Sequence, residues 1–145
     1  MQSPKPIDIR PAQASDVEAL CSLDLIAQRE EQRRQFIRRS VDTSTCVVAV
    51  AGEVVVGYGV LNYNFHDYGF IDMLYVSAEY RRGGAGTALL CHMESLCQTP
   101  KLFTSTNLSN LPMQSLLNKF GFELSGVIHN LDVGDPEIVY CKRLK

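Results

Sequence analysis

The segment Arg81-Arg82-Gly83-Gly84-Ala85-Gly86 is the most informative part of this sequence. It follows an apolar run from Phe70 to Val76, which predicts a strand, and it leads into a helical pattern that begins near Gly84. Glycines let the backbone approach an anion, and the free N–H groups at a helix start point toward that anion. The strand, glycine turn and helix therefore predict a phosphate-binding segment.

Strand and helix patterns alternate along the rest of the chain, and the order β-α-α-β-β-β-α-β-α-β-β predicts an α/β fold with a mixed sheet. We expect one domain over residues 1–145. Ser15 is the expected N-cap of the first helix, and Gly52-Glu53 is the expected hairpin turn. The expected strands cover residues 7–10, 46–51, 54–61, 69–76, 101–106, 122–129 and 138–144. The later helices are expected at about 28–40, from about 84, and at 111–120, with a loop at 64–68.

The bulk composition excludes several classes of protein. The net charge of −2 gives no global sign of a nucleic-acid binder. No apolar run approaches the roughly 18–20 residues that span a bilayer. The first six residues lack the apolar core of a signal peptide, so we expect a cytoplasmic location.

The five cysteines are an odd number and contain no C-x-x-C pair. This spacing is typical of neither a disulfide framework nor a zinc site. We interpret them as reduced, small apolar side chains, and we expect no bound metal. They are Cys21, Cys46, Cys91, Cys97 and Cys141.

The glycine turn lacks the Lys-Ser/Thr of a P-loop and the full G-x-G-x-x-G of a dinucleotide fingerprint. Its pattern, Arg81-x-x-Gly84-x-Gly86 after Met73-Leu74-Tyr75-Val76, resembles the acetyl-coenzyme A motif of the GNAT superfamily of N-acetyltransferases. The opening residues 7–12 resemble that family's first strand, and Asn110 followed by Gly121-Phe122 resembles its later motif. The resemblance covers nearly the whole chain.

The resemblance implies a GNAT fold, which is a mixed central sheet with splayed strands flanked by about four helices. It also implies acetyl-CoA as co-substrate, with its pyrophosphate on the amides of the glycine turn. Backbone groups of β-strand residues would bind the pantetheine arm as an added strand does, and Asn110 would bind the arm from the other side. The implied binding residues are Leu74, Tyr75, Val76, Arg81, Arg82, Gly83, Gly84, Ala85, Gly86, Thr87 and Asn110.

Acetyl transfer to an amine requires a base for the amine proton and a donor for the developing oxyanion. Asp72 is the leading candidate for the base, made more basic by burial, because family members commonly carry an acidic residue there. The alternative is that Asp72 only pairs with a loop amide or an arginine. The amide of Leu74 or Tyr75 could serve as the oxyanion donor.

Leu117 occupies the position at which the family usually carries a tyrosine as general acid. Leucine cannot donate a proton, so the common acid step is in question. Water is the first substitute, and the remaining candidates are Ser115, Gln114, Tyr75 and Tyr63.

The charged residues of the sequence favour two opposite kinds of acceptor substrate. The arginines of residues 28–40 could form an anion-binding wall or only a solvated face with a Glu30–Arg34 pair. An acidic rim would instead attract a cationic amine, and its members are Asp67, Asp132, Asp135 and Glu137.

We predict an acetyl-CoA-dependent N-acetyltransferase in which a primary amine, preferably of a small molecule, attacks the thioester directly. The alternatives are a protein N-terminal or lysine acetyltransferase and a non-catalytic CoA-binding regulatory module. An RNA-linked domain that uses the arginine helix is a further rival. The resemblance also implies a possible homodimer and no membrane partner.

Overall fold

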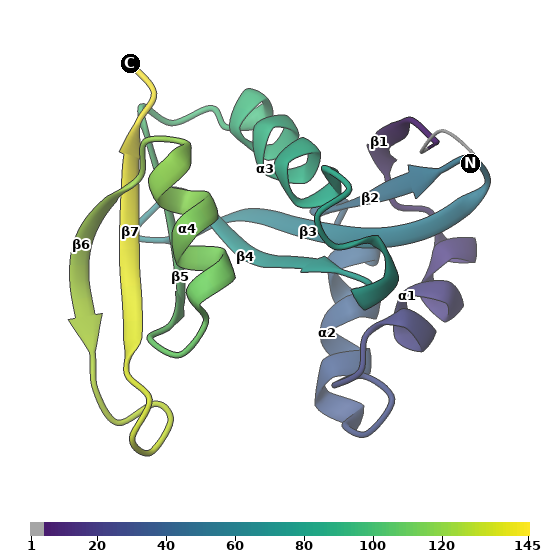
Figure 1. Cartoon of the computed structure of the whole chain (residues 1–145), viewed down its shortest axis with the longest axis horizontal. Helices are drawn as coiled ribbons and strands as arrows, with labels where there is room; N and C mark the ends of the chain where they lie inside the picture. The colour runs from purple at the N-terminus through teal and green to yellow at the C-terminus, as the bar shows by residue number, and fades with distance from the viewer. Residues whose placement is uncertain (1–4) are drawn as a thin grey trace. The chain divides into compact units, whose positions relative to one another are not determined.

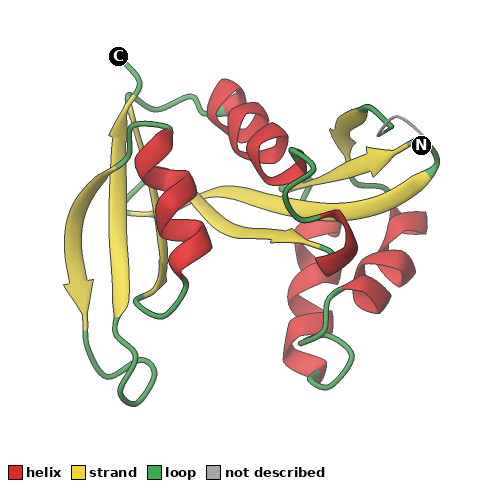
Figure 2. Ribbon diagram, viewed as in Figure 1, coloured by secondary structure: helices red, strands yellow, loops and turns green. Residues whose placement is uncertain are grey.

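The structure is a computed structural model that describes residues 5–145. Its elements follow the predicted order, with two short 3₁₀ turns added (Figures 1 and 2). The chain divides into two compact units. The first contains the residues up to Leu61 together with Met73–Leu96, and the second contains Asn62–Asp72 together with Cys97–Lys145. Strands β3 (Val54–Phe65) and β4 (Tyr68–Val76) contribute residues to both units.

The first unit is an antiparallel set of strands with helices on both sides (Figure 1). Residues of α1 and α2 share a buried core with β2, and the side chains that α3 buries face the glycines of β3. The elements are β1 (Ile7–Pro11), η1 (Ala14–Asp16), α1 (Val17–Leu23), α2 (Glu31–Asp42), β2 (Cys46–Ala51), η2 (Ala78–Tyr80) and α3 (Ala85–Leu96), together with parts of β3 and β4.

The unbroken apolar sequence of β2 follows from this arrangement, because a strand covered on both faces does not alternate with polar residues. Val48 lies in one core cluster with Leu20 of α1 and Ile37 of α2, and all three are fully buried. The neighbouring residues Val47 and Ala49 are also buried. The first unit therefore has apolar cores on both faces of its sheet.

The second unit contains a three-stranded antiparallel ladder, in which β7 lies between β5 and β6. Residues Gly69–Ile71 of β4 add a parallel neighbour to β5, against Leu102–Thr104. One helix, α4, belongs to this unit within the described part of the chain. The elements are β5 (Lys101–Asn107), α4 (Leu111–Lys119), β6 (Glu123–Ile128) and β7 (Glu137–Arg143).

The hydrogen-bonded strand order is β1-β2-β3-β4-β5-β7-β6. Since β4 and β5 are parallel and the pairs β1–β2, β2–β3, β5–β7 and β6–β7 are antiparallel, the sheet is mixed. The predicted fold class, a mixed sheet with about four helices, is confirmed within residues 5–145.

The expected loop at residues 64–68 is wrong, because β3 extends to Phe65 and β4 begins at Tyr68. A two-residue turn joins them, with φ of 53° at His66 and 67° at Asp67. Positive φ at both central residues is typical of a type I′ hairpin turn, which sequences usually mark with Asn-Gly. The edge contact of the His66 and Phe65 rings, with centroids 4.9 Å apart, stabilises a turn that carries no glycine signal.

Two helix starts also differ from the prediction. Ser15 lies inside η1, and the cap there is made by Asp16, whose carboxylate accepts a 2.7 Å hydrogen bond from the Gln13 N–H. The second helix begins at Glu31 rather than near residue 28. The residues before it form a turn, because the Asp24 carboxylate accepts the N–H groups of Ile26 and Ala27.

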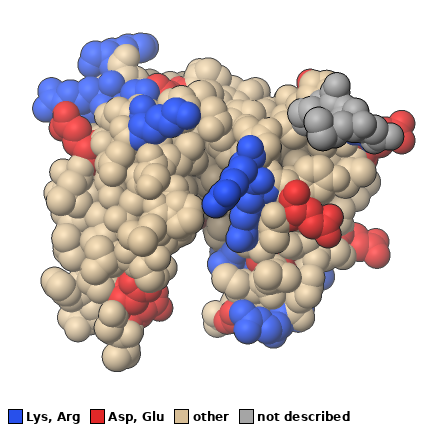
Figure 3. All heavy atoms as spheres, viewed as in Figure 1, with Lys and Arg blue, Asp and Glu red and all other residues tan. Residues whose placement is uncertain are grey.

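Charged side chains are interspersed on the surface. The face drawn in Figure 3 shows lysines and arginines in separate small groups, with acidic and uncharged surface between them. Within residues 5–145, no helix combines the length and apolar character needed to cross a bilayer.

Gly57 lies close to the backbone of β4. A Cβ atom built on Gly57 would lie 2.6 Å from the backbone oxygen of Tyr75 and 3.4 Å from the Leu89 side chain. A backbone oxygen cannot move aside as the end of a flexible side chain can. Glycine is therefore required at this position, where it lets β4 run against β3.

Replacing Gly57 with alanine is expected to lower the free energy of unfolding by about 1–3 kcal/mol, because the added methyl group overpacks β3 against β4. Gly126→Ala is the matched control, since its Cβ would meet nothing within 4 Å. Urea unfolding of the two variants measures the difference. Equal stability of both variants would contradict the requirement for glycine at position 57.

Candidate functional site

The turn after β4 has the geometry of an anion-binding loop. Arg82 has a φ of 68° and Gly84 a φ of 90°, both in the left-handed region. The Gly83 N–H bonds to the Tyr80 oxygen at 3.3 Å, which closes the turn after η2. A Cβ on Gly84 would meet nothing within 4 Å, so backbone conformation rather than space selects glycine there.

The N-terminus of α3 presents the amides that such a loop needs. The Ala88 N–H donates to the Gly84 oxygen at 2.9 Å, the first bond of the helical ladder. The earlier amides of Ala85, Gly86 and Thr87 precede that ladder, and a helix leaves its first N–H groups without helical partners. With the helix dipole added, these amides can bind a phosphate. The predicted helix start near Gly84 is thus confirmed, because α3 begins at Ala85.

The arginine pair divides into two roles. The Arg81 Nε donates to the backbone oxygen of Val76 at 3.2 Å, so Arg81 fastens the end of β4 to the turn. Arg82 is exposed and holds the positive φ. Leu74 and Val76 are half-buried in the same unit as the turn.

The side chain of Tyr75 makes contacts within the first unit that the sequence did not predict. Its hydroxyl accepts a 3.1 Å hydrogen bond from the Leu25 N–H, and its ring centroid lies 6.1 Å from that of Tyr58. These contacts hold the segment between α1 and α2 against β4. Tyr75 therefore acts in positioning that segment.

The buried carboxylate of Asp24 organises the same segment, and sequence reasoning missed it. Its side chain is fully buried and accepts from the Tyr58 hydroxyl at 2.5 Å and from Arg33 at 2.9 Å. Its other oxygen accepts the N–H groups of Ile26 and Ala27 at 2.9 and 3.1 Å. Every oxygen has partners, as burial of a carboxylate requires. The partners lie far apart in sequence, so no local pattern could reveal the cluster.

The Asp24 cluster raises the pKa values of both Tyr58 and Arg33. Burial raises the pKa of the Tyr58 hydroxyl, and the hydrogen bond and charge of Asp24 raise it further. Burial alone would lower the pKa of Arg33, but interaction with Tyr58 and Asp24 outweighs burial and raises that pKa. Tyr58 is thus a neutral donor and Arg33 a cation at physiological pH.

Three of the four arginines in α2 pair with carboxylates of the same unit. Arg34 and Arg38 both pair with Glu31, at 2.6 and 3.2 Å, and Arg33 pairs with Asp24. The expected Glu30–Arg34 pair is wrong, because α2 begins at Glu31 and Glu30 is its N-cap with extended backbone. These pairs weaken the interpretation of residues 28–40 as an anion-binding wall.

Asp72 lies in the second unit, and its expected burial is wrong. The residue is exposed, and its carboxylate accepts a 3.0 Å hydrogen bond from the Asn62 amide. Asp72 directly precedes Met73 in β4, so its side chain projects from the strand that leads to the glycine turn. The carboxylate is therefore accessible from solvent.

Asn110 caps α4. Its side-chain oxygen accepts a 3.2 Å hydrogen bond from the Met113 N–H, which leaves the NH₂ group as the part able to donate to a ligand. Leu117 lies about two helical turns further on and is fully buried as a core side chain of this unit.

The proposed substitutes for the missing tyrosine have local partners. Gln114 donates to the backbone oxygens of Asn107 and Leu108. The Tyr63 hydroxyl accepts the Gln98 N–H at 3.1 Å. Ser115 is exposed on α4. These local contacts do not single out any of the three side chains as the general acid.

Three members of the expected acidic rim lie together around the β6–β7 loop. Asn107 donates to Asp132 at 2.9 Å, and the Ser109 hydroxyl donates to Asp135 at 2.6 Å. Burial raises the pKa of Glu137, and the charges of Asp132 and Asp135 raise it further. These carboxylates therefore form one acidic cluster at the end of the β5–β7 ladder.

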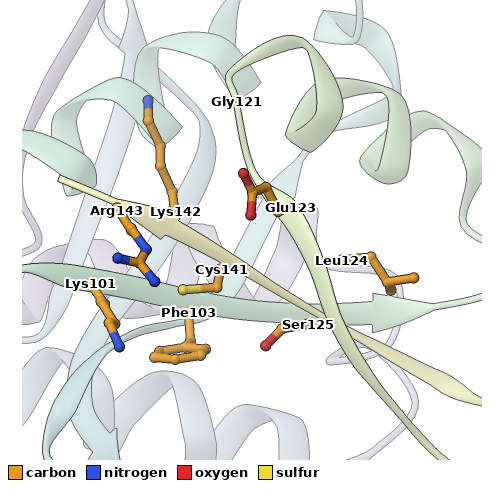
Figure 4. A pocket seen from close by; sticks show the side chains of 9 residues that line it. All are labelled: Lys101, Phe103, Gly121, Glu123, Leu124, Ser125, Cys141, Lys142 and Arg143. Atoms are coloured by element: carbon orange, nitrogen blue, oxygen red, sulfur yellow. The ribbon is translucent and has the colours of Figure 1, made fainter.

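The second unit also has a cavity of about 360 Å³ that sequence reasoning missed (Figure 4). It lies over the β5–β7–β6 ladder, with Phe103 and Cys141 in its floor and Lys101 and Arg143 beside them. The register brings these residues together, because Phe103 pairs with Cys141 and Lys101 with Arg143.

The cysteines are all free thiols. Burial raises the pKa of the Cys46 thiol to about 11, which fits an apolar core side chain. Cys91 is exposed on α3, so the interpretation of every cysteine as an apolar filler is wrong for this one. Among residues 5–145, no group of three or more His, Cys, Asp or Glu side chains is placed to hold a metal ion.

Comparison with known proteins identifies the family. The Acetyltransferase (GNAT) family profile matches residues 14–122. A GNAT-family acetyltransferase from Bacillus cereus ATCC 10987 is 34% identical, with a TM-score of 0.88 over 95% of this chain and 97% of that one. The chain therefore belongs to the GNAT acetyltransferase family. The curated proteins contain no match.

More distant structures share the fold. Arabidopsis thaliana Naa50, in complex with the bisubstrate analogue CoA-Ac-MVNAL, is 19% identical with a TM-score of 0.77, over 95% of this chain and 99% of that one. The ribosomal-protein-S18-alanine N-acetyltransferase from Escherichia coli is 16% identical with a TM-score of 0.78, over 97% and 95% of the two chains.

Asp24→Asn is expected to lower the free energy of unfolding by about 3–5 kcal/mol, because it leaves Arg33 without its buried anionic partner. Urea unfolding followed by circular dichroism measures the loss. The control is Glu31→Gln, which removes an exposed carboxylate that also pairs with arginines and should change stability little. If the two variants are equally stable, the Asp24 cluster does not stabilise the first unit.

Proposed function

We propose that this chain is an acetyl-CoA-dependent N-acetyltransferase whose catalytic domain is the whole of residues 1–145. Membership of the GNAT acetyltransferase family supports acyl transfer as the class of reaction. The observation that carries the choice of donor is the turn at residues 81–87, with left-handed backbone at Arg82 and Gly84 before the open N-terminus of α3.

In this proposal the pyrophosphate of acetyl-CoA binds the amides of residues 82–87, where the helix dipole favours its charge. Backbone groups of Leu74, Tyr75 and Val76 extend the sheet onto the pantetheine arm. Arg81 contributes by holding the Val76 end of the strand.

The chemistry is a direct transfer. A neutral amine attacks the acetyl carbon, the carbonyl oxygen becomes an oxyanion on the amide of Leu74 or Tyr75, and the C–S bond then breaks. The amine proton passes to Asp72, directly or through water. The leaving thiolate takes a proton from water, since Leu117 cannot supply one and a thiol pKa near 8.5 makes it a tolerable leaving group.

A primary amine of a small molecule is the acceptor we favour. The ion pairs of Arg34 and Arg38 with Glu31 argue against an anionic acceptor, and the acidic cluster of Asp132, Asp135 and Glu137 favours a cationic one. A protein N-terminus is the second candidate, because fold neighbours include Naa50 with its peptide-based analogue and the S18-alanine enzyme.

The direct test is titration calorimetry with acetyl-CoA, followed by thiol release with a panel of amines and peptide N-termini. Binding with turnover supports the transferase. Binding without turnover on any amine would favour a non-catalytic CoA-binding module, and absence of binding up to about millimolar acetyl-CoA would refute the assignment of the donor.

Gly84→Ala should raise the dissociation constant for acetyl-CoA about tenfold or more, because a side chain at a φ of 90° is strained and shifts the amides of the turn. Gly134→Ala is the matched control, with a φ of 76° and equally open surroundings. Calorimetry distinguishes the two. Equal affinity in both variants would place the pyrophosphate elsewhere.

Asp72→Asn should lower kcat by about 10²-fold or more while acetyl-CoA affinity stays unchanged, since it removes only the proton acceptor. Asn62→Ala, which removes the hydrogen-bond donor to Asp72, should give a smaller loss. Steady-state kinetics over a pH series measures both. A fully active Asp72→Asn enzyme would exclude Asp72 as the base.

A further inference from the structure

Three charged side chains of the second unit surround one point of its sheet. In the register, Cys141 of β7 lies between Phe103 of β5 and Glu123 of β6, and Arg143 pairs with Lys101 two residues further along. Residues two apart on a strand share a face, so all five side chains lie on the same side of the sheet. Strands are about 5 Å apart and such residues about 7 Å, so one small molecule above Cys141 can reach all of its neighbours.

The space above these residues is the cavity of about 360 Å³ described above, which we call the ladder cavity (Figure 4). Pockets that bind small molecules begin at about 300 Å³. Strand β6 has one extra residue here, because Leu124 pairs with Tyr140 and Gly126 with the next residue, Val139. A bulge of this kind bends the strand and redirects a side chain, and Ser125 at the bulge lines the cavity.

The charges of the ladder cavity are not compensated within the second unit. In the part of the chain that the structure describes, the ion pairs are made by other residues. The Lys101 Nζ lies 5.6 Å from the centroid of the Tyr68 ring, and Arg143 is exposed. Like charges directly opposite each other destabilise a sheet. An anionic group bound between Lys101 and Arg143 would remove that cost.

The thiol of Cys141 shows that both signs of charge act on the floor of the cavity. Burial raises the pKa of this thiol, Lys101 and Arg143 lower it, and Glu123 raises it. A simple anion bound near the two cations would therefore also be repelled by the Glu123 carboxylate. A ligand that carries a negative and a positive group side by side meets an opposite charge on each side.

We propose that the ladder cavity binds an aromatic α-amino acid. Lys101 and Arg143 hold its carboxylate, which the guanidinium can bind in a bidentate way, and Glu123 holds its ammonium group. The ring of the ligand packs on Phe103, whose own ring lies 4.9 Å from Phe65 and 5.6 Å from Tyr68.

The spacing of the charged side chains fits this ligand class. Glu123 and Arg143 are diagonal neighbours across β6 and β7, an arrangement in which side chains are about 7–8 Å apart. A carboxylate and an ammonium group on the same carbon bridge such a gap. The proposal concerns binding alone and does not depend on the transfer reaction, because it uses neither the glycine turn nor Asp72.

The test is backbone ¹H–¹⁵N NMR of the full chain, titrated with L-phenylalanine to about 50 mM at constant ionic strength and without acetyl-CoA. A ligand this small in an open cavity should have a dissociation constant of about 0.1–1 mM. Binding should shift the resonances of Lys101, Phe103, Glu123, Ser125, Cys141 and Arg143. Two analogues, 3-phenylpropionate without the ammonium group and phenethylamine without the carboxylate, should each bind about tenfold more weakly.

Two charge-neutralising variants assign the two ends of the ligand. Glu123→Gln should weaken L-phenylalanine about tenfold and leave 3-phenylpropionate unweakened. Arg143→Gln should weaken L-phenylalanine about tenfold and remove detectable binding of 3-phenylpropionate, while phenethylamine binds as before. Misfolding would weaken every ligand alike, so it cannot produce this crossed pattern. The controls Glu18→Gln and Arg39→Gln neutralise exposed residues of the first unit and should leave all three affinities unchanged.

Three results would overturn the proposal. The first is the absence of shifts at the cavity residues up to 50 mM L-phenylalanine. The second is binding of 3-phenylpropionate or phenethylamine as tight as that of L-phenylalanine. The third is a pair of variants that leave the affinities unchanged or lower all three alike, since the charges would then not act on the ends of the ligand as assigned.

Discussion

The fixed position of the end of β4 is the constraint on which the rest of the first unit depends. Gly57 allows the backbone of β3 to lie against the Tyr75 oxygen, and the Tyr75 hydroxyl holds the segment that Asp24 organises. The same strand end runs into the glycine turn, where Arg81 fastens the Val76 oxygen. A strained loop with positive φ persists only when its surroundings hold it, and these contacts supply that support.

The supports differ in kind. The Gly57 contact is steric, while the Asp24 cluster is a buried ion pair completed by neutral donors, so that every carboxylate oxygen is satisfied. Such clusters stabilise a unit mainly because breaking them leaves an uncompensated charge in the interior. The amides at the start of α3 are left open by comparison. Pre-organised anion binding requires a fixed backbone and N–H groups without partners. The contacts at the end of β4 supply the first, and the start of α3 supplies the second.

The sequence alone predicted the strand and helix order and the glycine turn, because both depend on local periodicity and on glycine's access to positive φ. It missed the Asp24 cluster, whose partners Arg33 and Tyr58 are brought together only by folding. It also missed the His66-Asp67 turn, which has no glycine, and it expected a buried Asp72 where the strand exposes it. Features that depend on neighbouring residues could be predicted from the sequence. Burial and contacts between distant residues could not, because they depend on the folded structure.

In the proposed site, backbone amides of the turn hold the pyrophosphate of acetyl-CoA. Backbone ¹H–¹⁵N NMR can follow this directly, by titrating the protein with acetyl-CoA and separately with S-acetylpantetheine, which lacks the pyrophosphate. We expect large shifts at Ala85, Gly86 and Thr87 with acetyl-CoA and small shifts there with S-acetylpantetheine. Equal shifts with both ligands, or acetyl-CoA shifts confined to other parts of the chain, would contradict it.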